Sequence, residues 1–347
     1  MSASQSKVHK RNNSDPTGGL ESRNRNNTVA KKFVSTSKSL DAIVTNLTQK
    51  LSTAIKKYGE YHKKVSILRN SLGNLHFQRN DFLLAEKEYI QALAIARDNY
   101  GHDDAFVAMI LGNLGIVYWK IENLNSSIFC LKESLRINRI LSRGTDVDEK
   151  VAESYHNLGM ALFLKKDFDK AQSTLEKALG SRKRLFGTKH VDVARTLDIL
   201  GKLFAAKGET RLALGCHMDA LRIKTELLGE ENPSTIISLM NVAHLYKCKG
   251  DLEMAIDLYD NAAKLQAKNA SFDETMIVEM GITLHILGDL YVQKLSYFDA
   301  LMSYKESSYA FDNAGLDRSD QRVLDLEKSM VKAQRLLETS DLFQIQE

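Results

Sequence analysis

Few residues of this chain combine the types and spacing that chemistry requires. Its 347 residues include nine His and three Cys, but no C-x-x-C pair and no G-x-S-x-G, G-x-x-x-x-G-K-S/T, H-E-x-x-H or G-x-G-x-x-G motif. His285 and Asp289 come nearest to a constellation, because residues four apart share one face of a helix. A metal site needs three or four convergent ligands. We therefore interpret these two as a surface pair and predict no catalytic residue, no metal site and no cofactor.

Positive charge is concentrated at the N-terminus. The net charge is +4, yet residues 1–39 carry eight basic side chains against Asp15 and Glu21, so the rest of the chain is slightly acidic. The tail is rich in Ser, Thr and Asn and poor in large apolar residues, and such a segment cannot bury enough surface to offset its ordering entropy. We predict that residues 1–38 are disordered. Nucleic-acid binding is disfavoured because the rest of the chain has no net positive charge. It stays an alternative because the basic tail could bind nucleic acid.

Two short motifs in this tail suit protein kinases. Arg11 stands three residues before Ser14 and Pro16 two after it, while Arg25 stands three before Thr28. An Arg at this distance suits a basophilic kinase, and phosphate would add a charge of about −1.5 to −2. The R-x-x-S-x-P motif resembles the phosphopeptides that 14-3-3 proteins capture. Ser14 and Thr28 are therefore candidate phosphorylation sites and 14-3-3 a candidate partner, with a chance match in a solubilising tail as the alternative.

The rest of the chain repeats one pattern about every 42 residues. Each copy has an anchor, a large or ring residue three positions later, and small residues twelve and nineteen positions later. A bulky residue stands sixteen positions after the anchor. The six anchors are Gly73, Gly115, Gly159, Gly201, Ala243 and Gly288. The bulky residues are Tyr89, Leu131, Leu175, His217, Tyr259 and Tyr304.

These offsets predict a helix–turn–helix hairpin in each copy. The small residues let a second helix approach the first closely, and the bulky residue fills the gap between them. Polar or Gly turns separate the two helices, as at Asn80-Asp81 and Gly250-Asp251. A hairpin of this kind cannot bury its apolar face alone, so the six copies are expected to stack around a continuous core. The scarcity of Pro also argues against an all-β protein.

The pattern resembles the tetratricopeptide (TPR) repeat, with its L-G-x-x-Y…A-x-x-x-F-x-x-A signature, over roughly residues 60–312. The long spacing looks most like the repeats of kinesin light chains. Connectors such as Gly187-Thr188-Lys189-His190 and Asn-Leu-Gly triads such as the one at Asn157 are similar to that family's linkers and N-L-A pattern. The resemblance implies an all-α, right-handed superhelical solenoid of six TPR-like hairpins and a protein-binding role.

The chain is predicted to have four parts. After the tail come an N-terminal capping helix at 39–59, six repeats at 60–316, and a C-terminal capping helix at 317–347. An apolar series of period 3.5 runs from Leu40 to Tyr58. Kinesin light chains bind the motor's heavy chain through a long heptad region, but this series is shorter than the three to four heptads of a stable coiled coil. We interpret it as a cap on the first repeat, which solenoid ends need.

The resemblance also places a concave groove on the first helix of each hairpin. It assigns to the groove Asn70, Asn74, Asn113, Trp119, Glu153, His156, Asn157, Arg195, Lys202, Asn241, His244 and Lys247. Asn suits a peptide backbone because it offers two donors and an acceptor. The single Trp is either a hydrophobic anchor for a partner or a core residue between hairpins. The Lys and Asn set with which chaperone-binding TPRs hold a C-terminal carboxylate is incomplete here, so we expect no chaperone-tail binding.

The sequence therefore favours a non-catalytic scaffold or adaptor that binds extended segments of other proteins. A light-chain-like cargo adaptor with kinesin heavy chain as partner is its motor-linked version. A nucleic-acid-associated protein is the alternative and an enzyme a distant one. The N-terminus has no apolar segment typical of a secretory signal, and the longest apolar stretch, residues 105–119, is shorter than a membrane span. We expect a cytoplasmic protein without a membrane segment, associated with the cytoskeleton in the motor-linked version.

Overall fold

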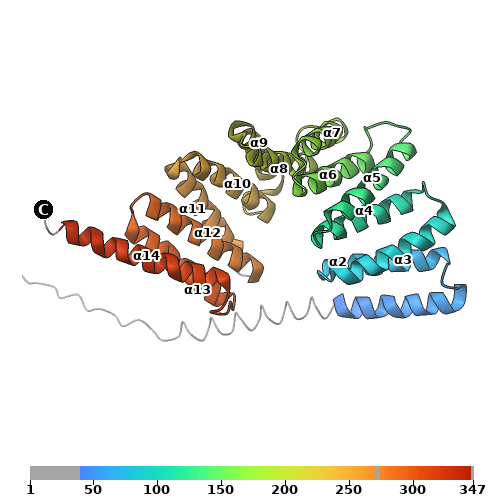
Figure 1. Cartoon of the computed structure of the whole chain (residues 1–347), viewed down its shortest axis with the longest axis horizontal. Helices are drawn as coiled ribbons and strands as arrows, with labels where there is room; N and C mark the ends of the chain where they lie inside the picture. Colours follow the sequence, from blue (N-terminus) through green and yellow to red (C-terminus); the bar gives the residue numbers. More distant parts are fainter. Residues whose placement is uncertain (1–39, 270–273, 345–347) are drawn as a thin grey trace, which may run out of the picture. The chain divides into compact units, whose positions relative to one another are not determined.

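The computed structural model of the chain describes residues 40–269 and 274–344. The predicted disorder of the tail, and with it Ser14 and Thr28, lies outside the described residues. The chain divides into two compact units, residues 1–43 and 44–347, and the second unit contains the repeated hairpins. Every regular element in the described ranges is a helix (Figure 1).

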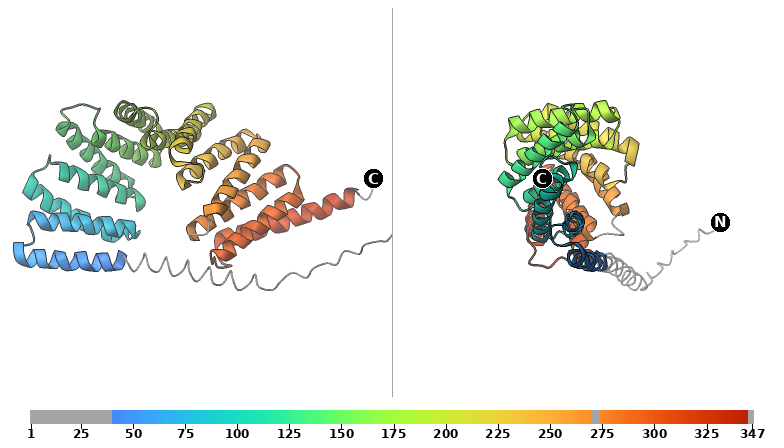
Figure 2. Two further views of the ribbon diagram at one scale, coloured as in Figure 1. Left: turned by 180° about the vertical axis from the view of Figure 1, so that it is seen from behind. Right: turned by 90° about the vertical axis from the view of Figure 1, so that its right-hand side faces the viewer.

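A helix over residues 40–58 is followed by thirteen labelled helices in the described chain. These are α2 (Lys63–Gln78), α3 (Phe82–Tyr100), α4 (Ala105–Lys120), α5 (Leu124–Leu141), α6 (Glu149–Leu164), α7 (Phe168–Phe186), α8 (Val191–Ala206), α9 (Thr210–Leu228), α10 (Pro233–Lys249), α11 (Leu252–Asn269), α12 (Glu274–Gln293), α13 (Tyr297–Asn313) and α14 (Gln321–Gln344). Helices α2 to α13 pair into six hairpins, each of which packs against the next (Figure 2).

The repeated offsets are the packing contacts of each hairpin. At Gly73, Gly115, Gly159 and Gly201 an added Cβ atom would lie 2.6 Å from the side chain sixteen residues later, and at Gly288 it would collide with Tyr304. The glycine therefore makes room for the bulky residue of the second helix. The small and bulky residues twelve, sixteen and nineteen positions after the anchors are all buried. The fifth copy instead has Ala243, whose methyl group is itself buried.

The connectors between hairpins combine a helix stop with a helix start. Gly187 and Gly229 end their second helices with φ of +81° and +85°, a conformation that favours glycine. Three residues later, the side chains of His190 and Asn232 accept hydrogen bonds from backbone N–H groups in the first turn of the next helix. The family-like linker motif is thus a compact reversal between one hairpin and the next.

Both ends of the stack are covered by a further helix. Leu51 and Ala54 of the first helix pack with Val65 and Leu72 of the first hairpin. Helix α14 packs against α12 and α13, where Leu326 is buried in the sixth hairpin's core. The all-α solenoid of TPR-like hairpins expected from the sequence is confirmed.

Among the described helices, α12 is long and apolar enough to cross a membrane by length and composition alone. The longest apolar stretch of the sequence, residues 105–119, forms most of α4 instead. Helix α12 packs against α11, α13 and α14, and its Leu284, Leu287 and Leu290 are buried. Core helices of folded proteins pass the same test, and a third of the apolar window of α12 is buried within the stack.

Candidate peptide-binding surface

The first helices expose side chains in register along the stack. The residue six positions before the anchor is exposed in the first five hairpins, and so is the residue following the anchor in three of them. Helices α2, α4, α6 and α8 are neighbours in space, each in contact with the next. We call these exposed residues the first-helix surface, and they are Ile67, Asn74, Met109, Glu153, Arg195, Lys202, Ile237 and His244.

The predicted groove residues divide into three classes. Asn74, Glu153, Arg195, Lys202 and His244 are exposed as expected. Five residues are half-buried, namely Asn113, Trp119, Asn157, Asn241 and Lys247. The expected exposure of Asn70 and His156 is wrong, because each is only 6% exposed. Both stand three positions before an anchor and contact the neighbouring second helix or hairpin instead of solvent.

The first Asn residues join two hairpins. The Asn113 amide nitrogen donates to the side-chain oxygens of Asn70 and Asn74, at 3.4 and 3.3 Å. The Tyr89 hydroxyl also donates to Asn74, at 2.6 Å. In contrast, the side chain of Asn157 forms no hydrogen bond within the described part of the chain. The Asn113 amide is therefore used in packing between hairpins, whereas the Asn157 amide is available to a bound segment.

Trp119 contributes to the core between the second and third hairpins. It is partly buried against a cluster that includes Leu158 and Leu162 of α6. Of the two interpretations of this residue, the packing between hairpins is the one that its contacts support.

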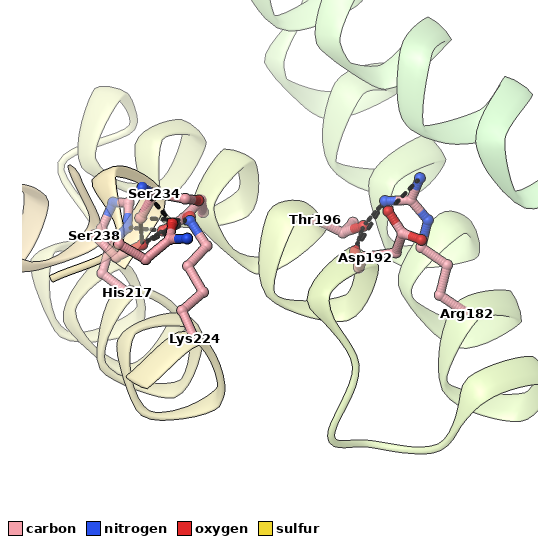
Figure 3. Close-up of polar contacts among 9 residues, drawn as sticks. Arg182, Asp192, Thr196, His217, Lys224, Ser234 and Ser238 are labelled. Carbon is pink, nitrogen blue, oxygen red and sulfur yellow. Dashed lines mark hydrogen bonds and ion pairs between the residues drawn. The ribbon is translucent and has the colours of Figure 1, made fainter. Parts of the chain in front are cut away.

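A buried polar cluster links the third hairpin to the fourth (Figure 3). The Arg182 guanidinium lies 3.1 Å from His156 Nδ1, 2.7 Å from the Thr196 hydroxyl and 2.9 Å from the Asp192 carbonyl oxygen. Because Arg can only donate, Nδ1 of His156 must be the acceptor, and the ring is neutral. Burial, with Arg182 and Arg195 nearby, lowers the pKa of His156 to about 3. We call these residues the His156 cluster.

A second buried cluster links the fourth hairpin to the fifth (Figure 3). The Lys224 ammonium donates to Asp198 at 2.6 Å, to the Ser238 hydroxyl at 2.9 Å and to a backbone carbonyl at 3.0 Å. His217 Nδ1 and the Ser238 hydroxyl also donate to Asp198, at 3.1 and 2.9 Å. Burial alone would raise the pKa of Asp198, but these three donors hold it below its usual value. We call these residues the Asp198 cluster.

Comparison with known proteins identifies the repeat. A family model described as tetratricopeptide repeat matches residues 63–140 and 150–226, and a second model of this repeat matches residues 238–271. Together they cover more than half of the chain. The chain belongs to the tetratricopeptide repeat family. A curated relative, a clustered mitochondria protein homolog of Emericella nidulans, is 22% identical over 187 residues, which are 54% of this TPR chain. The chain spans about 15% of that relative's length.

Solved structures share the TPR fold. BtubC (BKLC) from P. vanneervenii has a TM-score of 0.56 at 22% identity over 67% of this chain and 93% of its own. A putative kinesin light chain of Podosopora anserina with nearly identical TPR-like repeats has a TM-score of 0.51 at 18% identity, over 58% of this chain and 94% of its own. A Rap protein complexed with Competence and Sporulation Factor has a TM-score of 0.52 at 15% identity, over 92% and 99%. At these identities the likeness extends to the fold alone.

The polar clusters follow a second periodicity of the TPRs, which was not predicted from the sequence. The residue 23 positions after one anchor bonds to the residue five before the next anchor. This pair is Asn138–Ser154 at 2.9 Å, Arg182–Thr196 at 2.7 Å and Lys224–Ser238 at 2.9 Å. In the fifth TPR, Gln266 and Thr283 at the same positions both contact the sulfur of Met240. A polar residue recurring at these two offsets inside apolar helices was the signal that could have revealed it.

The Asp198 cluster contains Ser, His, Asp and Lys, but its geometry is that of a packing contact. Its four residues are at most 7% exposed. The Ser238 hydroxyl bonds to Asp198 and Lys224, whereas a nucleophilic Ser needs a base such as His within hydrogen-bond reach. Within residues 40–269 and 274–344, no three His, Cys, Asp or Glu side chains come together in a way that suits a metal ion.

His285 and Asp289 lie beneath the C-terminal helix of the TPR array. Their side chains are 3.9 Å apart, but each has a nearer partner. His285 Nε2 lies 3.0 Å from the Ser329 hydroxyl of α14, and the Tyr304 hydroxyl donates to Asp289 at 2.7 Å. His285 therefore helps attach α14 to the sixth hairpin, whereas Asp289 bonds within that hairpin and its side chain stays 43% exposed.

Proposed function

We propose that this TPR chain is a protein–protein interaction scaffold that binds an extended segment of a partner along its first-helix surface. The observation that carries the proposal is the register of this surface. Exposed side chains recur at the same positions of successive hairpins, so they can contact successive residues of a bound chain. The buried clusters beneath α6, α8 and α10 fix the helices that present them, and preorganisation of this kind lowers the cost of binding.

The chemistry of the surface changes along the stack. The first two hairpins present Ile67, Asn74 and Met109, whereas the fourth presents Arg195 and Lys202. Asn can bond to the backbone of a segment, and the two cations favour an acidic or phosphorylated residue. A segment that is apolar where it meets the first two hairpins and acidic where it meets the fourth suits this surface best.

The light-chain-like version of the proposal names kinesin heavy chain as a partner. It is supported by the 42-residue spacing and by the likeness in fold to a putative kinesin light chain. Retention of a purified kinesin heavy-chain stalk on the immobilised chain is its test. No retention would leave the scaffold proposal intact and remove the motor-linked version.

The scaffold proposal is tested with peptides selected on the full-length chain from a random-peptide display library. Arg195→Glu with Lys202→Glu should weaken the selected peptides by tenfold or more, because it reverses the charge of the fourth hairpin's surface. Arg184→Glu with Arg211→Glu is the matched control, since both residues are exposed on second helices. Equal loss with both variants, or no loss with either, would contradict the proposal.

The tail motif carries the separate proposal that 14-3-3 binds the phosphorylated chain. It rests on the Arg11 to Pro16 motif around Ser14. Kinase-treated protein should be retained on immobilised 14-3-3, and Ser14→Ala should abolish this, while Thr28→Ala, without a following Pro, should have a smaller effect. Equal retention of the Ser14→Ala protein would contradict the proposal that 14-3-3 binds phosphorylated Ser14.

A further inference from the structure

A groove of about 700 Å³ lies between α11, α12 and α13, away from the first-helix surface. Helices α11 and α13 are second helices that both pack on α12, so α12 forms the groove's floor. The floor is lined by Met280, Leu284, Leu287 and Tyr291. Met302 and Tyr309 of α13 also line it, and they are 44% and 68% exposed. The groove thus combines a partly buried apolar floor with exposed apolar walls.

The spacing of the lining residues fits a helix. The four floor residues follow one another at intervals of four, three and four, which makes one stripe along α12. The stripe is about 17 Å long, which is the length of about three helical turns. A helix that lies in such a groove contacts it through residues at i, i+3 or i+4, and i+7. Flexible Met side chains adapt readily to such a surface.

The groove lies in the acidic part of the molecule. Residues 251–320 carry thirteen acidic and five basic side chains, whereas residues 40–250 carry 24 acidic and 31 basic ones. The charged groups that line the groove are Asp260, Lys264, Asp299, Lys305 and Glu306. Lys264 is already paired with Asp260, 2.5 Å away. Asp299 and Glu306, each about one turn from Met302 on α13, outnumber the remaining cation Lys305, so the rim has one negative charge in excess.

The same negative charge acts on the hydroxyl of Tyr291. Burial raises the pKa of its hydroxyl, and Asp260 and Asp299 raise it further, while Lys294 acts in the opposite direction. Two carboxylates of the rim therefore act on a ring at the end of the groove's floor. A ligand that brings positive charge to this rim is attracted by these carboxylates, and an acidic ligand is repelled.

We propose that this groove binds a basic amphipathic helix of a partner protein. The apolar face of the helix lies on the α12 stripe, between Met302 of α13 and Ala263 and Ala267 of α11. Its Lys or Arg side chains reach Asp299 and Glu306. This interaction is separate from peptide binding at the first-helix surface, because the two sites share no residue. A partner that carries both kinds of segment, or two partners at once, can be held by one chain.

The experiment measures binding of a fluorescein-labelled, 18-residue Leu/Lys amphipathic helix to the full-length chain by anisotropy, with its Leu/Glu counterpart alongside. Asp299→Lys with Glu306→Lys should weaken the Leu/Lys peptide by tenfold or more and strengthen the Leu/Glu peptide. Asp312→Lys with Glu230→Lys is the matched control, because it makes the same charge change at exposed sites outside the groove. Circular dichroism establishes that each variant is folded.

A second pair of variants separates the groove from general attraction to an acidic surface. Met302→Ser with Tyr309→Ser should weaken the Leu/Lys peptide by about tenfold, whereas Met254→Ser with Phe298→Ser, equally exposed on α11 and α13 but outside the groove, should leave it unchanged. Equal effects of the two pairs would overturn the proposal, since binding would then be non-specific. Sedimentation showing a dimer that the Met302 and Tyr309 changes dissociate would also overturn it, because a second copy would then be the occupant.

Discussion

The His156 cluster and the Asp198 cluster occupy the same positions of consecutive hairpins, yet they balance charge differently. In one, the buried cation Arg182 is held by neutral acceptors, and the nearest carboxylate, that of Asp192, is 3.9 Å away. In the other, the buried cation Lys224 lies 2.6 Å from the buried Asp198 carboxylate. Both clusters give each buried donor a partner. The comparison teaches that the interface between TPRs requires complementarity across it, not a particular residue type.

The largest expected effect separates the two clusters by charge. Asp198→Ala leaves Lys224 buried without its counter-charge, and should lower the free energy of unfolding by about 3–5 kcal/mol. His156→Ala removes only a neutral acceptor from Arg182 and should cost about 1–2 kcal/mol. Urea denaturation followed by circular dichroism measures both.

The double change Asp198→Leu with Lys224→Met is the control for that prediction. Replacing both members of a buried pair by apolar residues is often neutral. Because His217 also loses its acceptor here, the double change should recover only part of the loss. An equal cost for Asp198→Ala and His156→Ala would remove the distinction between the clusters.

The anchors beneath the two clusters provide the next comparison. A Cβ atom on Gly159 would lie 2.6 Å from Leu175, and one on Gly201 would lie 2.6 Å from the His217 ring. Leu175 can change rotamer, but His217 is bonded to Asp198. Gly201→Ala should therefore cost about 2–3 kcal/mol and Gly159→Ala about 1–2, after the gain in helix propensity. Thermal melting of both proteins checks the order, and the reverse order would contradict it.

Acid should weaken the two clusters in different pH windows. The pKa of His156 is lowered to about 3 in the folded chain, from its usual value of 6.5, so only the unfolded chain takes up this proton as the pH falls. The contribution of neutral His156 to the free energy of unfolding is therefore complete above about pH 6.5. It declines by about 1.4 kcal/mol per pH unit down to pH 3. The pKa of Asp198 is lowered, so its contribution is complete above about pH 4 and is lost as the pH falls further.

The measurement is the free energy of unfolding at pH 7 and pH 5. The wild-type chain should lose about 2 kcal/mol more than His156→Gln over this interval, because Gln keeps an acceptor for Arg182 but does not titrate. A His156→Gln chain with the wild-type slope would show that other groups account for the acid sensitivity.

The smallest effect compares two Asn residues at one position of consecutive hairpins. Asn113→Ala breaks the bonds to Asn70 and Asn74 and should cost about 1 kcal/mol. Asn157→Ala breaks no hydrogen bond of the described chain and should cost less than about 0.5 kcal/mol. Thermal melts of the single variants decide this, and a larger loss for Asn157→Ala would mean that its amide is also part of the packing.

The periodic packing could be predicted from the sequence, but the environment of individual groove residues could not. Gly201 and His217 repeat a size rule that acts within one hairpin, so spacing alone reveals it. Whether a residue three positions before the anchor is exposed depends on the next layer. His156 is buried because an Arg reaches it from α7, while Arg195, on the same helix as Thr196, turns outward. The polar pairs between consecutive hairpins were harder to predict, because Asn, Arg and Lys have the same role there without sharing a size or charge.

Helix α8 is held from both sides, since Thr196 bonds into one cluster and Asp198 into the other. The two residues are separated by a single position, and Arg195 adjoins them on the solvent side. Rotation of this helix about its axis would break bonds in both clusters at once. These bonds hold α8 at two points, and with it the backbone from which Arg195 and Lys202 project. In the proposed complex, the entropy lost on binding therefore falls on the side chains and on the incoming segment, and a segment of the wrong spacing is expected to bind poorly.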